Sequence, residues 1–185
     1  MSYRQWSPCA PTCMPLPPCP PLPPPPVCTP GSSFSAVLNA PSYTIQQTST
    51  IIPFNQELTG SPDFNQNSGI FTAPTTGTYQ FSFGLDLSTT LVAAPLVAGS
   101  AAVVSLVIGG TTTIAKWSFN VSSTVATTET KAGVIAVPLT AGQQVSLNIQ
   151  QPTALVAPNQ QTLLGNQVLN TYPWQTWFSG VYIGA

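Results

Sequence analysis

The stretch between Pro8 and Pro30 constrains the fold most, because twelve of the chain's 21 prolines lie in it. Proline lacks a backbone N–H donor and fixes φ, so neither a helix nor a central strand can form there. An extended, polyproline-like arm remains. At about 3.1 Å per residue, thirty such residues would span roughly 90 Å, which exceeds the width of a single domain. The sequence therefore predicts an N-terminal connector over residues 1–31 that can reach a neighbouring molecule.

The remaining residues, 32–185, have the usual length of one domain. Only 4% of the chain is charged, and its net charge is −1. This leaves no basic field for nucleic-acid phosphates or anionic lipids, so we expect neither a nucleic acid nor a membrane as a partner. A near-neutral surface also provides little repulsion between copies, which favours self-association.

The first residues, MSYRQWSPCAP, have no apolar run behind Arg4, so no secretory signal is seen in the sequence. The cysteines nevertheless resemble a framework that forms in an oxidising environment. Both observations are explained if the protein is synthesised in a cytoplasm and its thiols are exposed later, when a cell lyses or a particle is released. Spore coats and virions form in this way. A secreted protein whose signal has been removed is the competing history.

The segment Leu91–Ile108 carries no charge over eighteen residues. Pro95 and Gly99 interrupt it, no basic residues flank it, and the turn-forming pair Gly109-Gly110 follows it. We therefore expect a loop and a buried strand here rather than a transmembrane helix.

Beyond Gly31, short apolar or alternating runs are separated by turn residues every eight to twelve positions, which is typical of an antiparallel sandwich or barrel. The run TYQFSFGLDL alternates and predicts a strand with one face in the core. Its core-facing residues would be Tyr79, Phe81, Phe83, Leu85 and Leu87. Two further strands are predicted about Gly109-Gly110, two more about Ala141-Gly142, and a last one in TWFSGVYIGA.

The run FNQNSGIFTAPTTGTYQFSFGLDL, residues 64–87, resembles the signature of the C1q/TNF-like trimeric jelly roll: an aromatic-Asn start, Gly-x-Phe-x-Ala-Pro, then Gly-x-Tyr-x-Phe. FSAVLN resembles the opening strand of that family, IIPFNQ the second, LTAGQQVSLNI the penultimate hairpin and TWFSGVYIG the closing strand. The resemblance covers nearly all of residues 33–185. It implies an all-β, ten-stranded antiparallel jelly-roll sandwich that forms a homotrimer, with apolar side chains along the threefold axis.

The residues that carry this resemblance form an expected core and trimer signature, in which each buried aromatic side chain contributes about 1.5–3 kcal/mol. They are Phe34, Phe54, Phe71, Pro74, Gly77, Tyr79, Phe81, Phe83, Phe178 and Gly180. The simpler interpretation is that the aromatic residues form the core and have no further role.

The chain contains no histidine, which excludes a Ser-His-Asp triad, a Cys-His pair and imidazole metal ligands. We therefore expect no enzymatic activity, no cofactor and no metal site assignable from sequence. Some members of the resembled family bind calcium near the trimer apex, and Asp63 or Asp86 would be the candidates for such a site. Glu129 and Lys131, two residues apart, are predicted to form an exposed ion pair of small value.

The four cysteines are candidates for disulfides between chains: Cys9, Cys13, Cys19 and Cys28. Their spacings do not match common zinc motifs. A bridge within one arm remains open for Cys9 and Cys13. A polyproline rod would separate Cys19 from Cys28 by about 28 Å, far beyond the roughly 4.4–6.8 Å between Cα atoms that a bridge requires. Cys28 therefore either pairs with another chain or stays reduced, and the connectivity is left open.

Bacterial proteins that the chain resembles lie on spore surfaces, as collagen-like exosporium glycoproteins and spore-appendage fibre subunits. We therefore predict a structural subunit of an extracellular fibre on the surface of a spore or particle, with trimers stacked head to tail through their arms. The apolar residues expected to anchor the arm are Tyr3, Trp6, Met14, Leu16, Leu22 and Val27. Two alternatives stay open: a trimeric adhesin or ligand-binding head whose arm attaches to an anchoring protein, and a phage or viral structural protein.

Overall fold

The computed structural model describes residues 32–90, 101–120, 127–151, 160–164 and 176–185, and these residues form strands, turns and loops without a helix. Within these ranges no helix is present that could cross a membrane. The strands are β1 (Ser33–Val37), β2 (Ser42–Thr44), β3 (Thr50–Ile51), β4 (Gln56–Thr59), β5 (Phe64–Asn65), β6 (Ile70–Thr72), β7 (Gly77–Thr90), β8 (Ala101–Ile108), β9 (Thr112–Asn120), β10 (Thr127–Leu139), β11 (Gln144–Gln150), β12 (Gln160–Leu164) and β13 (Trp177–Gly184).

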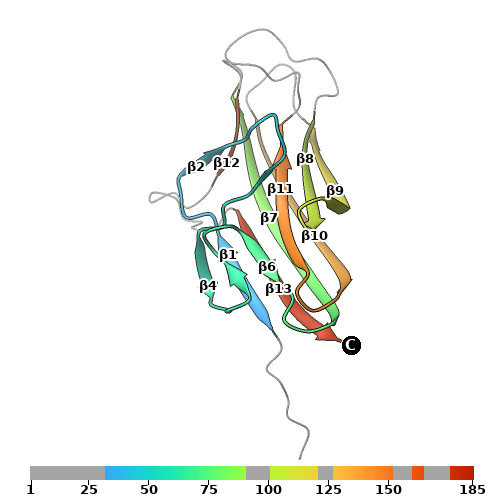
Figure 1. Ribbon diagram of the computed structural model, residues 1–185. Coiled ribbons are helices and arrows are strands. Elements are labelled where there is room, and N and C mark those ends of the chain that lie inside the picture. The colour runs from blue at the N-terminus through green and yellow to red at the C-terminus, as the bar shows by residue number, and fades with distance from the viewer. Residues whose placement is uncertain (1–31, 91–100, 121–126, 152–159, 165–175) are drawn as a thin grey trace, which may run out of the picture.

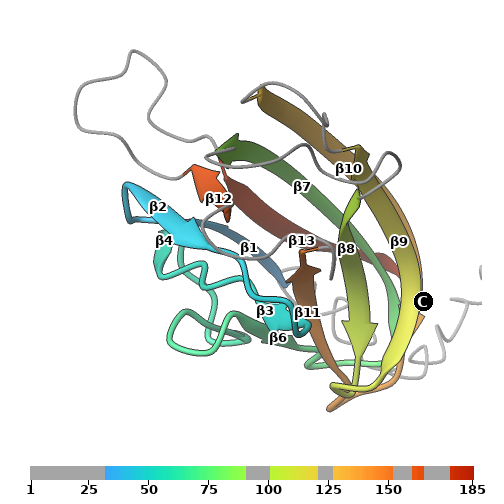
Figure 2. The same ribbon diagram turned by 90° about the horizontal axis from the view of Figure 1, so that it is seen from above.

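The strands form two antiparallel sheets that face each other (Figures 1 and 2). The seven-stranded sheet, called the β7 sheet below, has the order β2-β12-β7-β13-β1-β4, and β10 pairs with the other edge of β7. The six-stranded sheet, called the β11 sheet, has the order β5-β6-β11-β8-β9, and β3 pairs with β11. The all-β jelly-roll sandwich expected from the sequence is confirmed.

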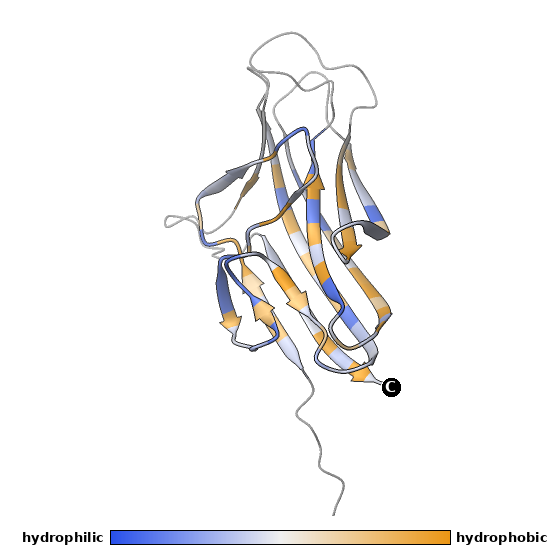
Figure 3. Cartoon of the chain, viewed as in Figure 1, coloured by the Kyte–Doolittle hydropathy of each residue, from blue (hydrophilic) through white to orange (hydrophobic). Residues whose placement is uncertain are grey.

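The core lies between the two sheets and is rich in aromatic side chains. The alternating residues of β7, from Tyr79 to Leu87, are buried as their spacing predicts, and Figure 3 shows the resulting bands of orange along the strands. Seven rings form a continuous cluster with centroid separations of 4.5–6.4 Å. Its members are Phe34, Phe54, Phe64, Phe71, Tyr79, Phe81 and Phe178. Such pairs add to the free energy that area burial alone supplies.

One predicted hairpin is confirmed and the other is not. β8 and β9 pair about Gly109-Gly110, where φ values of 61° and 76° favour glycine. The strands on either side of Ala141-Gly142 do not pair with each other: β10 joins β7, whereas β11 joins β6, β3 and β8. This connection therefore crosses from one sheet to the other, because each strand has a long-range partner that local spacing cannot reveal.

The number of strands also differs from the ten that the resemblance implied. The described ranges contain thirteen, of which four have only two or three residues: β2, β3, β5 and β6. β2 pairs with β12, β3 and β6 pair with β11, and β5 pairs with β6. Of the apolar segment before Gly109, Ala101–Ile108 is strand β8, as expected, and residues 91–100 lie outside the described residues.

Gly180 allows two core rings to pack directly on the backbone of β13. A Cβ atom at this position would lie 2.5 Å from Cε1 of Phe34 and 2.9 Å from Cε1 of Phe81, and both rings are buried. We expect Gly180→Ala to lower the free energy of unfolding by about 1–3 kcal/mol through overpacking. Chemical denaturation measures this loss. Gly60→Ala is the matched control, because Gly60 is exposed and an added Cβ there would meet its nearest neighbour at 3.5 Å. An equal denaturation midpoint for the two variants would contradict the packing argument.

Candidate assembly surface

The outer face of the β7 sheet, which points away from the core, is made of small, hydroxylated and apolar side chains from three adjacent strands. We call it the assembly face. Its residues are Ala132, Val134, Ala136 and Pro138 on β10, Gln80, Ser82 and Gly84 on β7, and Trp177, Ser179, Val181 and Ile183 on β13. They reach the same face because side chains alternate along each strand.

Strand register places these residues in rows across the assembly face. One row runs from Val134 through Ser82 to Ser179, and the hydroxyl oxygens of the two serines are 2.7 Å apart. The next row runs from Ala136 through Gln80 to Val181. Because the hydroxyl groups of Ser82 and Ser179 share a hydrogen bond, each keeps a partner when the centre of the face is covered.

The assembly face carries most of the exposed apolar bulk of the described chain. Val134 is 65% exposed, Ile183 52% and Val181 39%, and among the described residues only Leu58 joins them as an exposed large hydrophobic residue. None of the residues of this face is charged. A patch of this composition is typical of a protein–protein contact.

The nearest charged group is Asp86, which lies on the same outer side of the β7 sheet, two residues beyond Gly84, at the border of the assembly face. Asp86 accepts a hydrogen bond of 2.5 Å from the hydroxyl of Thr130. The next nearest charged groups lie behind the face. Lys131 and Glu129 form the predicted ion pair, with 2.7 Å between Nζ and Oε1. They alternate with the exposed residues of β10, and Lys131 Nζ lies 5.9 Å from the ring centroid of Phe119 in the β11 sheet. The pair is partly exposed, so its contribution to stability is small, as predicted.

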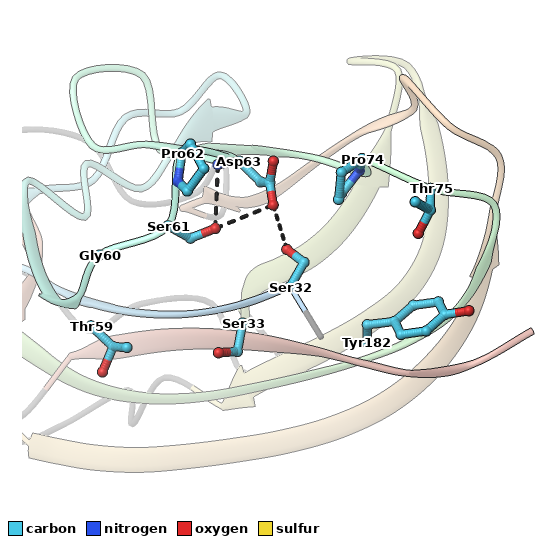
Figure 4. A pocket seen from close by; sticks show the side chains of 10 residues that line it. All are labelled: Ser32, Ser33, Thr59, Gly60, Ser61, Pro62, Asp63, Pro74, Thr75 and Tyr182. Atoms are coloured by element: carbon cyan, nitrogen blue, oxygen red, sulfur yellow. Dashed lines mark hydrogen bonds between the residues drawn. The ribbon is translucent and has the colours of Figure 1, made fainter. Parts of the chain in front are cut away.

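A cavity of about 500 Å³ opens at the end of the sandwich where the chain enters β1 (Figure 4). We call it the Asp63 pocket. Its lining includes Ser32, Ser61, Pro62, Asp63, Pro74 and Tyr182. These residues come from the start of the described chain, the loop after β4, the loop after β6 and the closing strand, so only the folded sandwich brings them together.

The hydrogen bonds of Asp63 leave one side of its carboxylate open. Ser32 Oγ donates to Oδ2 over 2.6 Å, and Ser61 Oγ donates to the same oxygen over 3.3 Å (Figure 4). The backbone N–H of Thr72 donates to the carbonyl oxygen of Asp63 over 2.7 Å and holds the loop in place. No hydrogen bond to Oδ1 and no ion pair of Asp63 occurs within the described ranges.

The residues of the expected core and trimer signature lie inside the sandwich rather than on the assembly face. The aromatic members are buried. Gly180 lies beneath two of the rings, and the position that a Cβ of Gly77 would take is occupied by the Tyr182 ring. Pro74 is separate from the others, because it lines the Asp63 pocket. The predicted arm anchors, Tyr3, Trp6, Met14, Leu16, Leu22 and Val27, and the four cysteines lie outside the described residues.

The sequence did not single out Val134, Val181 or Ile183 as surface residues. A signal was available: in GVIAV and GVYIG, apolar residues occupy both alternating sets of positions, whereas a sheet face in water is usually polar.

The two candidates for a calcium site, Asp63 and Asp86, have different hydrogen-bond partners. Asp63 accepts a hydrogen bond from the hydroxyl of Ser32, and Asp86 accepts one from the hydroxyl of Thr130. No three His, Cys, Asp or Glu side chains of the described chain gather as a metal-binding group.

Comparisons with known proteins agree with this architecture. The family model described as "C1q domain" matches residues 33–165. The globular domain of zebrafish complement 1qA protein is similar in structure, with a TM-score of 0.50, 18% identity and coverage of 83% of this chain and 97% of that one. The Eiger TNF structure from S. frugiperda has a TM-score of 0.58 and 10% identity, covering 84% of this chain and 94% of its own. A search of curated proteins finds no match.

Proposed function

Because the chain belongs to the C1q domain family, we propose that its jelly roll forms a homotrimer that serves as the structural subunit of an extracellular fibre. Domains with this C1q/TNF-like fold are typically trimeric, occur in extracellular proteins, and are generally structural or ligand-binding rather than enzymatic. In the proposed organisation, residues 32–185 form the trimeric domain and residues 1–31 form the connector.

The assembly face supports the trimer. Val134 and Val181 would leave water on association, and each buried Å² of apolar surface contributes about 25 cal/mol before the cost of association. No charged side chain of the face would lose its hydration, which is the largest penalty in burying a surface.

The position at which the arm joins the folded domain is the observation that supports the fibre proposal. Ser33 pairs with Val181, so the chain enters β1 at the same end of the sandwich at which β13 leaves it (Figure 1). Three arms would leave a trimer from this one end. Arms that bind the next trimer make a head-to-tail contact, which does not close on itself and so produces a filament.

Three arms acting together strengthen each joint between trimers. Once one arm is bound, the other two bind at a high effective concentration. An arm stiffened by proline also loses little conformational entropy on docking. Oxidation of Cys9, Cys13, Cys19 and Cys28 would then lock the joint covalently. We place such fibres on the surface of a spore or particle, attached through an anchoring protein.

Deleting residues 1–30 tests this proposal. Full-length protein is expected to form filaments in negative-stain electron microscopy, whereas the truncated protein is expected to elute from gel filtration as a soluble trimer. A full-length variant with all four cysteines changed to serine is the matched control, and its filaments should form but dissociate on dilution. Truncated protein that still polymerises would show that the arm is not the connector. A single trimer peak for the full-length chain would favour the anchored binding head instead.

A further inference from the structure

The Asp63 pocket presents a negative charge that has no cationic partner within the described residues. Asp63 Oδ2 is occupied by two serine hydroxyl groups, and Oδ1 is open. Of the two lysines of the described chain, Lys131 is paired with Glu129, and no ion pair joins Lys116 to an acidic group. Arg4 is the chain's third cationic side chain and its only arginine.

The pocket lining also offers hydroxyl groups and apolar surface to a segment that enters it. Hydroxyl donors can bind the backbone carbonyl groups of an extended segment, and aromatic surface can pack against its apolar side chains. Ser33 and Thr59 supply hydroxyl donors at the pocket, and Pro62 and Tyr182 supply apolar surface. The Tyr182 ring packs on Tyr79 with 5.2 Å between centroids, and its hydroxyl group makes no hydrogen bond to the described residues.

Within residues 1–31, the side chains that match this pocket lie in the first ten positions. Arg4 is the only charged side chain of residues 1–31, and Trp6 and Pro8 follow it closely. We propose that the Asp63 pocket is the seat of this segment from a second copy of the chain, with Arg4 of one trimer paired with Asp63 of the next. This inference rests on the proposed fibre function and names its contact.

The length of the arm fits the required path. In a head-to-tail stack, the arm must pass along the neighbouring sandwich to reach a pocket at that sandwich's far end. β7 has fourteen residues, so it spans roughly 46 Å at about 3.3 Å per residue. The 28 residues that separate Arg4 from Ser32 span about 87 Å as a polyproline helix. The arm is therefore long enough to cross a neighbouring sandwich and enter its pocket.

A charge exchange in the full-length protein tests the pairing. Arg4→Glu is expected to weaken joining about tenfold per arm, because it removes a charge-assisted contact and places two carboxylates together. Three arms compound this loss to roughly a thousandfold, so filaments should be absent at concentrations at which the wild type assembles. Adding Asp63→Lys to the Arg4→Glu protein should restore the filaments. Lys116→Glu makes the same charge change outside the pocket and should leave assembly unchanged.

A peptide of residues 1–14 with serine in place of Cys9 and Cys13 tests the seat without filaments. The Arg4→Glu full-length protein leaves its own pockets open and should bind this labelled peptide saturably in fluorescence anisotropy. Adding Asp63→Asn, which keeps the size of the side chain and an acceptor for the serines, should weaken binding about tenfold. Near-ultraviolet circular dichroism verifies that each variant is folded.

The outcomes separate this inference from the fibre proposal. Filaments that need the arm but are indifferent to residues 4 and 63 would overturn the seat and keep the fibre. Peptide binding that depends on Asp63, in a full-length protein that never polymerises, would keep the pocket as a peptide site but overturn both the fibre and the contact between trimers. Absence of peptide binding would overturn the seat. Another outcome is a wild-type protein that is a single trimer and binds no peptide, while the Arg4→Glu protein does bind it. That result would show an arm seated on its own trimer, which contradicts docking on the next one.

Discussion

Val134→Asp is expected to convert the proposed trimer to monomers while leaving each sandwich folded. Val134 is 65% exposed in the single chain, so a carboxylate there costs the monomer little. In the proposed trimer the same change would bury three carboxylates near one another, at about 3–5 kcal/mol for each unpaired charge. Sedimentation-velocity ultracentrifugation measures the loss of trimers, and circular dichroism measures the retained fold.

Ser118→Asp is the matched control for this change. Ser118 is exposed on β9, and register pairs it with Val103 of the β11 sheet, on the opposite side of the molecule from the assembly face. A carboxylate there should leave the trimer intact. If both variants remain trimeric, the trimer uses another surface. If both become monomeric, net charge rather than the position of the carboxylate controls association.

Phe178→Ala is expected to lower the free energy of unfolding by about 3–5 kcal/mol. Phe178 is fully buried, and its ring contacts three others, with centroid separations of 5.1 Å to Phe34, 5.4 Å to Phe54 and 5.9 Å to Phe81. Removing the ring leaves a cavity between the two sheets. The neighbouring rings do not fill it, because Phe34 is held on β1 and Phe54 on the loop between β3 and β4. Guanidinium-induced unfolding at a fixed protein concentration measures the loss.

Leu58→Ala provides the comparison for the Phe178 change. Leu58 lies on β4 and is 46% exposed, so its truncation should cost less than about 1 kcal/mol. A similar midpoint for the two variants would mean that the aromatic cluster does not determine stability. Both variants must be compared at one protein concentration, because the proposed trimer would add a concentration-dependent term to the apparent stability.

The local pattern of the chain was sufficient to predict several elements. Alternation over Tyr79–Leu87 identifies the strand and its buried face, because the side-chain period of a strand is two residues wherever the strand lies. Gly109-Gly110 identifies a turn, because both residues need φ values that other residues avoid. The ordered motifs of residues 64–87 resemble one family, and the C1q domain match includes them.

Pairing between strands that are far apart in the sequence decided the other features of the fold. β10 and β11 follow each other about a short turn, yet they belong to different sheets, because β7 and β6 supply their partners. Val134 and Val181 share one face because β7 lies between their strands. Asp63 accepts a hydrogen bond from Ser32, which lies 31 positions earlier in the sequence. Periodicity indicates which way a side chain points within its own strand. It carries no information about which strand lies alongside. Both the assembly face and the Asp63 pocket depend on which strands are neighbours.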